Sequence, residues 1–147
     1  MKIVCIGRNY RAHANELGNA IPEEPVVFLK PPTSLVPLGG PIRLPAFSND
    51  IHHEIELVYS LFHKNGRAQA DKVTIGLDLT ARDLQLDLKA KGLPWEKAKA
   101  FDGSAYVAEQ SVAIESFPPT GHIDFMLKRN GKVVQAGHSG QMLFDVP

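Results

Sequence analysis

Two glutamates one residue apart, Glu54 and Glu56, are the residues of this sequence whose spacing most favours chemistry. They lie in an apolar stretch typical of a β-strand, where side chains two positions apart project from one face, about 6.6 Å apart along the backbone. Two carboxylates about 4 Å apart repel by about 4 kcal/mol at an effective dielectric near 20, so a sheltered pair needs a cation between them. Asp78 follows the apolar run 73–77 and supplies a third carboxylate. Three carboxylates without a cysteine favour Mg²⁺ or Mn²⁺ over Zn²⁺.

A solvated sheet face is the alternative interpretation of the same two glutamates. On an antiparallel sheet, a Glu-x-Glu pair commonly faces water while the residues between pack inward. Here Val58 continues the glutamate face, and Ile55 and Leu57 make the opposite face apolar. A strand that is apolar on both faces is typical of a buried position. The spacing alone leaves both the metal site and the solvated face open.

His13 and Glu16 are three residues apart in a segment, 9–17, whose pattern predicts a short helix. Residues at this spacing share a helix face and can touch. A carboxylate beside an imidazole fixes its tautomer and raises its basicity, which suits a general base acting on water. An ordinary pair on a helix surface would have the same spacing.

Arg82, Gln85 and Lys99 are candidates for binding an anion. Arg82 and Gln85 share a face at the start of a helix predicted over 80–91, directly after Asp78. A helix N-terminus favours negative groups, so this pair could hold a carboxylate substrate, although an ordinary first-turn arginine is common. Lys99, between two alanines and before Phe101, has the least solvent-like setting of the lysines in its loop.

The elements that must position these residues are mostly strands. Residues 2–6, 25–30, 51–62 and 73–78 are predicted strands, and the proline-rich segment 31–45 is predicted to be loop and extended chain. Thr80 and Asp83 resemble a capping box that would begin the second helix. Asn130 and Gly131 predict a hairpin between 123–128 and 132–136. The pattern indicates an α+β fold that is mainly β.

Length and composition limit the class of protein. The 147 residues are predicted to form a single domain, 1–147. Sixteen basic and sixteen acidic residues cancel, so nothing favours nucleic acid, and no run approaches the roughly 18 apolar residues of a membrane span. Cys5 is the single cysteine, which excludes an internal disulfide and fits a reducing compartment. We expect a cytoplasmic protein.

The motifs together resemble the fumarylacetoacetate hydrolase family, most closely its small acylpyruvate hydrolases, oxaloacetate decarboxylases and related isomerases. The resemblance covers nearly the whole chain and rests on residues 7–10 with His13, 28–31, 53–57, 78–83 with Gln85, and 91–95 with Lys99. It implies a mixed β-roll, a homodimer, a small keto-acid substrate and one Mg²⁺ or Mn²⁺ per subunit.

The resemblance also implies a role for each candidate residue. The metal ligands would be Glu54, Glu56 and Asp78, and the water-activating dyad would be His13 and Glu16. In the same pattern, Lys99 would stabilise developing negative charge, and Arg82 and Gln85 would help to hold the substrate. Two departures stand out: the stretch between residues 62 and 73 is shorter than in relatives, and the family's C-terminal strands are missing after residue 147.

The expected activity is hydrolytic cleavage of a carbon–carbon bond in small 2,4-dioxo acids of the acylpyruvate or fumarylpyruvate type, through a metal-bound enolate. An oxaloacetate decarboxylase and a 2-hydroxy-diene-dioate isomerase or tautomerase are alternatives on the same site, since all three reactions pass through an enolate. An alternative of another class is a catalytically incomplete metal-binding domain or fragment, because of the missing strands.

Overall fold

The computed structural model describes residues 1–11, 20–117 and 121–146. Residues 12–17 of the helix predicted over 9–17, which include His13 and Glu16, lie outside the described residues. The elements in chain order are β1 (Ile3–Gly7), β2 (Val26–Lys30), η1 (Pro32–Ser34), β3 (Leu35–Leu38), β4 (Ile51–Lys64), β5 (Arg67–Ala81), α2 (Arg82–Ala90), α3 (Glu96–Lys99), β6 (Ala105–Ala108), β7 (Val112–Ala113), η2 (Ile114–Ser116), β8 (Asp124–Arg129), β9 (Lys132–His138) and η3 (Ser139–Gln141).

The chain divides into two compact units. The first unit comprises Met1–Cys5, Phe28–Val58 and Thr74–Ser111, and the second comprises Ile6–Val27, Tyr59–Val73 and Val112–Pro147. All the candidate site residues that the structure describes belong to the first unit. The expectation of a single domain stays a prediction.

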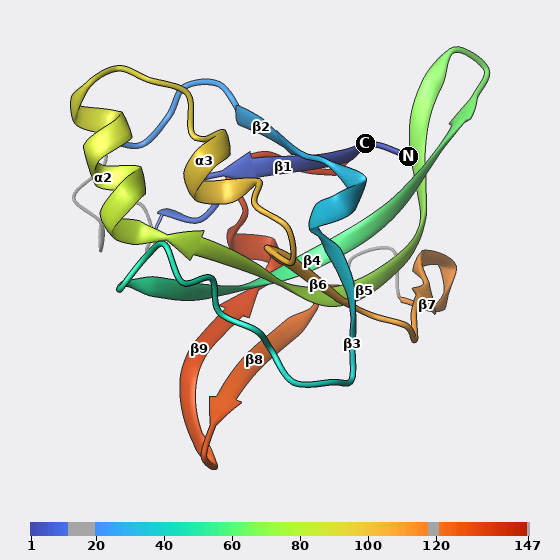
Figure 1. Cartoon of the computed structure of the whole chain (residues 1–147). Coiled ribbons are helices and arrows are strands. Elements are labelled where there is room, and N and C mark those ends of the chain that lie inside the picture. The colour runs from blue at the N-terminus through green and yellow to red at the C-terminus, as the bar shows by residue number, and fades with distance from the viewer. Residues whose placement is uncertain (12–19, 118–120, 147) are drawn as a thin grey trace. The chain divides into compact units, whose positions relative to one another are not determined.

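A sheet with the strand order β3-β6-β5-β4 organises the first unit (Figure 1). β3 pairs with β6 in parallel, and β6 pairs with β5 in antiparallel register, with Asp78 opposite Ala105. The β5 residues from Gly76 to Ala81 are all buried, which is typical of a strand covered on both faces. Gly76 is required there, since a Cβ atom would lie 2.8 Å from the Tyr106 carbonyl oxygen.

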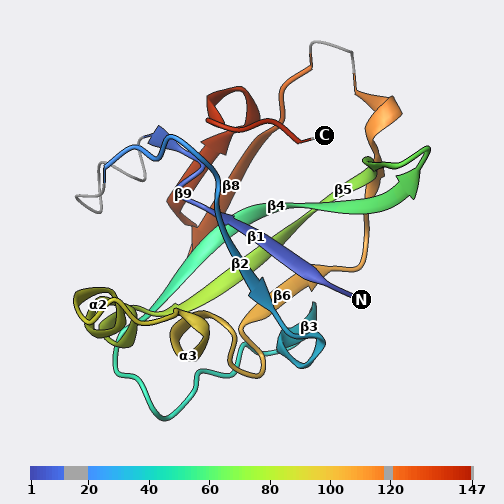
Figure 2. The ribbon, with the colours of Figure 1, turned by 90° about the horizontal axis from the view of Figure 1, so that it is seen from above.

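The helices α2 and α3 lie side by side, and α2 begins at the residue after β5 ends (Figure 2). Ala81, Leu88 and Ala98 form a small apolar core, against which Ile51, Leu84 and Phe101 pack. Leu88 shares the buried face of α2 with two polar residues, Arg82 and Gln85. This face is therefore apolar at its far end and polar beside β5.

The structure departs from the predictions at three places. The helix begins at Arg82 rather than at Thr80, because Thr80 is a fully buried residue of β5 and the N-cap is Ala81, without a side-chain cap. Segment 31–45 contains η1 and β3, and Pro37 is tolerated because β3 is at the sheet edge. The loop expected around Lys99 contains the one-turn helix α3.

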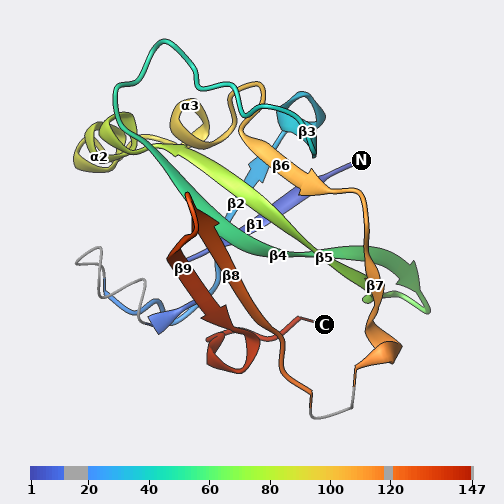
Figure 3. The same ribbon diagram turned by 90° about the horizontal axis from the view of Figure 1, so that it is seen from below.

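The two Asn-Gly pairs of the sequence form tight turns. Asn65 and Gly66 have φ of 52° and 80°, and Asn130 and Gly131 have φ of 52° and 78°. Two successive positive φ values are the pattern of the type I′ turn that fits strand twist. In the second unit the latter pair joins β8 to β9, which confirms the predicted hairpin (Figure 3). The structure is mainly β with few helices, as predicted, and none of the helices it describes is long and apolar enough to cross a membrane.

Asp83 connects α2 to the loop before β4. Its Oδ1 accepts hydrogen bonds from Ser48 Oγ at 2.6 Å and Leu84 N at 2.8 Å, and its Oδ2 accepts one from Asn49 N at 3.2 Å. The Arg82 amide also donates to the Asp50 carbonyl at 2.8 Å. These bonds fix the start of the helix that carries Arg82 and Gln85.

We expect the Asp83 bonds to make stability depend on pH. The hydrogen bond from Ser48 and those from the backbone amides lower the pKa of Asp83, so its carboxylate stabilises the fold above the ordinary aspartate pKa of about 3.9. This contribution is lost as the pH falls through the lowered value. In urea unfolding, Asp83→Asn should therefore be less stable than the parent near pH 7 and approach it at acid pH. Asp71→Asn, at an exposed position of β5, is the control, and a deficit for Asp83→Asn that persisted unchanged at acid pH would contradict the account.

Candidate active site

Five charged side chains from separate elements of the first unit meet: two carboxylates and the three cations around them. Glu54 comes from β4, Asp78 from β5, Arg82 from α2, Lys99 from α3 and Lys30 from the end of β2. Their side chains are between 1% and 12% exposed, so the charges are almost fully removed from water. We call this set the charge cluster.

Lys99 lies between the two carboxylates. Its Nζ is 2.7 Å from Glu54 Oε2 and 2.7 Å from Asp78 Oδ2. The other oxygens have their own cations, because Arg82 Nη2 contacts Glu54 Oε1 and Lys30 Nζ lies 2.9 Å from Asp78 Oδ1. Burial lowers the pKa of Lys99, but the charges of Asp78 and Glu54 outweigh burial and the pKa is raised. Lys99 is therefore a permanent cation at neutral pH.

Glu56 lies beside the charge cluster, with no ion pair of its own among the described residues. Burial raises its pKa to about 8, and the negative charges of Asp78 and Glu54 contribute to this rise. The side chains of Glu54 and Glu56 therefore lie in the same region, as the strand period predicts. A further cation placed there would lower the pKa of Glu56 and favour its ionised form.

The three predicted metal ligands fit a hard divalent cation in their chemistry. All are carboxylates, and two of them already touch one cation. The pKa of the third, Glu56, is raised by burial and then by the negative charges of the other two. Within residues 1–11, 20–117 and 121–146, however, no three His, Cys, Asp or Glu side chains are arranged as a metal site. Lys99 lies between Glu54 and Asp78 instead. The assignment of Glu54, Glu56 and Asp78 as ligands stays a prediction.

Arg82 and Gln85 are adjacent and buried, as their spacing predicts. Arg82 Nη1 donates to Gln85 Oε1, and the two residues are 8% and 5% exposed. Arg82 Nε is buried and has no hydrogen-bond partner in the described part of the chain. The guanidinium therefore retains a donor for an anionic ligand.

Cys5 is poorly suited to act as a nucleophile. Burial, followed by the negative charge of Asp78, raises its pKa to about 12. A thiol with this pKa is protonated at neutral pH and reacts poorly.

Lys30 and Ser104 are site residues that sequence reasoning did not single out by chemistry. Lys30 is 3% exposed and Ser104 is fully buried, and Lys30 Nζ donates to Ser104 Oγ at 2.9 Å. The one available signal was a lysine at the end of the predicted strand 25–30, directly after the apolar run 26–29. Nothing local in the sequence marks Ser104.

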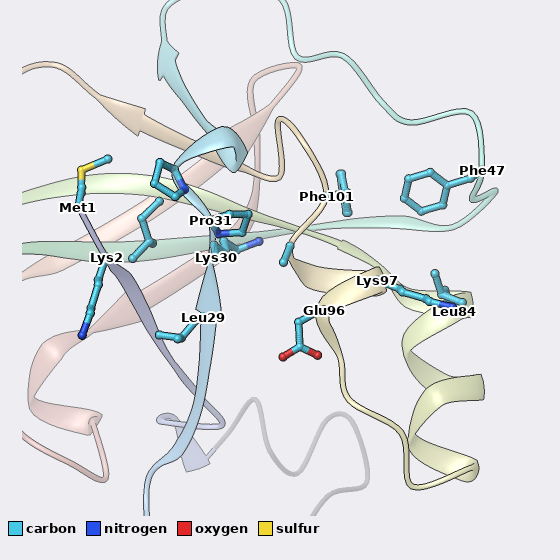
Figure 4. A pocket seen from close by; sticks show the side chains of 13 residues that line it. Met1, Lys2, Leu29, Lys30, Pro31, Phe47, Leu84, Glu96, Lys97 and Phe101 are labelled. Carbon is cyan, nitrogen blue, oxygen red and sulfur yellow. The ribbon is translucent and has the colours of Figure 1, made fainter.

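An apolar hollow of about 950 Å³ opens beside the charge cluster (Figure 4). Leu29, Lys30 and Pro31 contribute to its wall from one side, and Glu96 and Phe101 from the other. None of the three carboxylates lines it. The hollow is therefore distinct from the predicted metal site.

The comparisons with known proteins define the class. The family model described as fumarylacetoacetate (FAA) hydrolase C-terminal matches residues 2–147. The chain thus belongs to the fumarylacetoacetate hydrolase family. It is 40% identical over 153 residues to the mitochondrial oxaloacetate tautomerase FAHD1 of Bos taurus, with 99% of this chain and 68% of the relative covered.

Two solved structures show the same fold. A fumarylpyruvate hydrolase from Pseudomonas aeruginosa, in complex with Mn²⁺ and pyruvate, has a TM-score of 0.84 at 32% identity, covering 97% of this chain and 66% of that one. A 5-carboxymethyl-2-hydroxymuconate delta-isomerase from Mycobacterium smegmatis has a TM-score of 0.76 at 30% identity, covering 99% and 56%. These matches confirm the predicted fold. The chain spans about two thirds of the length of the oxaloacetate tautomerase.

We expect Glu56 to make the metal-free protein less stable as the pH rises. Because its folded pKa is about 8 and the ordinary glutamate pKa is about 4.3, the folded state holds a proton that the unfolded state has lost between these values. The slope for one proton is at most about 1.4 kcal/mol per pH unit. With a chelator present, the free energy of unfolding of the parent protein should fall between pH 5 and 8. That of Glu56→Gln should fall less steeply over the same range. Equal slopes for the two proteins would contradict the assigned pKa shift.

Proposed function

We propose that this chain carries the site of a divalent-metal-dependent enzyme that cleaves a carbon–carbon bond in small 2,4-dioxo acids by hydrolysis. The observation that carries the proposal is that Glu54 and Asp78 both contact one buried cation, Lys99. Glu56 is close enough for the charges of both carboxylates to raise its pKa further, beyond the effect of burial. The Mn²⁺ in the fumarylpyruvate hydrolase structure supports a divalent ion of this kind.

Glu54, Glu56 and Asp78 would hold Mg²⁺ or Mn²⁺. When bound, such an ion would supply Lewis-acid stabilisation of negative charge on the oxygens of an α-keto acid. Arg82, with Gln85 at its side and a buried Nε donor, would hold a carboxylate of the substrate. The three proposed ligands are on the strands β4 and β5, and Arg82 and Gln85 are at the start of helix α2. Side chains on strands and helices are held more precisely than side chains on loops.

His13 and Glu16 would activate the water. The imidazole, oriented by Glu16, would remove a proton from water as it attacks the distal carbonyl, and such base catalysis contributes about 10²–10⁴-fold. Lys99 would stabilise the developing oxyanion. Loss of one such donor commonly lowers kcat by about 10²–10³-fold.

The balance of charge supports a dianionic substrate. Three carboxylates (Glu54, Glu56, Asp78) face three basic side chains (Lys30, Arg82, Lys99), so the described site is neutral when all are ionised. A divalent ion would add two positive charges. A keto acid with two carboxylates would restore neutrality, which favours a dicarboxylate over a monocarboxylate.

Glu54→Ala and His13→Ala should separate metal binding from hydrolysis. We expect Glu54→Ala to lose Mn²⁺ binding, measured by calorimetry, and turnover together, because it removes an oxygen ligand, one of the two carboxylates that Lys99 contacts and the carboxylate that Arg82 contacts. His13→Ala should keep Mn²⁺ affinity within about threefold and lose about 10²–10⁴-fold in kcat. His63→Ala, at an exposed position near the end of β4, is the control. Normal turnover by Glu54→Ala saturated with metal would show that the site is wrongly assigned.

Action on oxaloacetate is the second candidate, favoured by the oxaloacetate tautomerase at 40% identity. Decarboxylation or tautomerisation needs the enolate-stabilising groups but no attacking water. Acetylpyruvate and oxaloacetate should therefore be assayed side by side with Mg²⁺ and with Mn²⁺. If oxaloacetate is decarboxylated, we expect that turnover to survive His13→Ala, whereas hydrolysis of acetylpyruvate should not.

We also propose that the protein is a cytoplasmic homodimer. The proposal follows from the family resemblance and the single cysteine. The mass measured in solution by light scattering tests the dimer directly.

A further inference from the structure

Lys30 is the most deeply buried cation of the charge cluster. Its side chain is 1% exposed, and it comes from the last residue of β2. Burial lowers its pKa, and the charge of Asp78 only partly offsets this effect. Taking an ammonium out of water costs several kcal/mol, so such a lysine persists only where its donors are well matched.

The donors of Lys30 are fully used. Its Nζ lies 2.9 Å from Asp78 Oδ1 and donates to Ser104 Oγ at 2.9 Å, to the Ser104 carbonyl at 3.2 Å and to the Lys99 carbonyl. An ammonium has three N–H donors, which these three hydrogen bonds use, and Asp78 Oδ1 adds an ion pair. Lys30 has no donor left for a substrate, which excludes it from the reacting groups.

One of these contacts determines how Asp78 presents its carboxylate. Lys30 holds Oδ1, and the other oxygen, Oδ2, turns to the nitrogen of Lys99, which also binds Glu54 Oε2. Without Lys30, Oδ1 would be a buried charged oxygen without a cation, and rotation of the carboxylate would relieve this. The contact therefore keeps Oδ2 on the side of Glu54.

The remaining contacts position the backbone of Lys99. Lys30 binds the carbonyl oxygens of Lys99 and Ser104, and Ser104 Oγ also donates to the Lys99 carbonyl at 2.9 Å. The Ser104 carbonyl in turn accepts the amide of Leu79, the neighbour of Asp78 on β5, at 2.8 Å. The strand of Asp78 and the segment after α3 are thus tied together at Lys30.

We propose that Lys30 is a positioning residue for the active site, which fixes the Asp78 carboxylate and the Lys99 backbone in one arrangement. The inference rests on the proposed function, in which Asp78 is a ligand and Lys99 meets the oxyanion. Lys30 acts through these two residues and touches neither the substrate nor the reacting atoms. Partners that orient a metal ligand typically change metal affinity or activity by about 10–100-fold when they are removed.

Lys30→Met tests this role, because methionine keeps the length of the side chain and removes the charge and all three donors. We expect Mn²⁺ affinity, measured by calorimetry, to fall about 10–100-fold, and kcat to fall by a similar factor with a smaller change in KM. Ser34→Ala is the matched control. Ser34 is also fully buried and donates to the next carbonyl, that of Ala100, at 3.2 Å, without touching Asp78.

A purely structural role would give a different result. It would lower the melting temperature of Lys30→Met and leave the Mn²⁺ affinity of the folded protein and its kcat at parent values, and this outcome overturns the inference. If Lys30→Met does not fold, Lys30→Gln replaces it, since the amide keeps two donors for the carbonyls and lacks the charge. Parent-like Mn²⁺ affinity and kcat in folded Lys30→Gln would equally overturn the inference.

A crystal structure of the variant separates this inference from the proposed function. Failure of the parent chain to bind Mn²⁺ would count against the proposed function alone. In that case Lys30 is judged by geometry. Movement of the Asp78 carboxylate away from Lys99 in the variant, but not in Ser34→Ala, supports the positioning role, and an unmoved carboxylate overturns it.

Discussion

The ammonium of Lys99, held at 2.7 Å from both Glu54 and Asp78, is the interaction on which the site depends. Two carboxylates cannot remain ionised side by side in a buried place unless cations offset their repulsion. Here the cations come from three different elements: β2, α2 and α3. The site therefore forms only when these elements pack correctly, which links the small apolar core under α2 and α3 to the position of every charge around β5.

Stability alone does not account for such a cluster. A buried ion pair recovers its desolvation cost only with good geometry, and apolar residues of similar volume often stabilise a fold as well or better. Paired charges with shifted pKa values instead gather at functional sites. Glu56 shows this most clearly, because its pKa near 8 leaves it ready to ionise when positive charge arrives. Packing elsewhere must offset the desolvation cost of these buried charges. It comes from β5, which is covered on both faces, and from helix α2, whose apolar far end packs in the core.

The names of the relatives show that this fold serves more than one reaction: a hydrolase, a tautomerase and an isomerase share it with this chain. Function lies in the site rather than in the fold. In the proposed function, the shared step is the build-up of negative charge on an enolate oxygen. A cluster with several fixed cations around oxygen ligands suits that shared step, whereas the residues that handle water or protons decide which product forms.

The sequence by itself determined the local features. Strand alternation placed Glu54 and Glu56 in one region, helical spacing paired Arg82 with Gln85, and the Asn-Gly turn at Asn130 fixed a hairpin, because each depends on neighbours a few residues apart. Only the tertiary structure decided that Lys99 bridges residues 45 and 21 positions away, and that Lys30 meets carbonyls 69 and 74 positions away. It also kept Thr80 in β5, against its capping pattern, because buried contacts of that strand outweigh a local preference. Long-range charge pairing leaves no periodic signal in a chain, since it arises from packing between elements that the sequence keeps far apart.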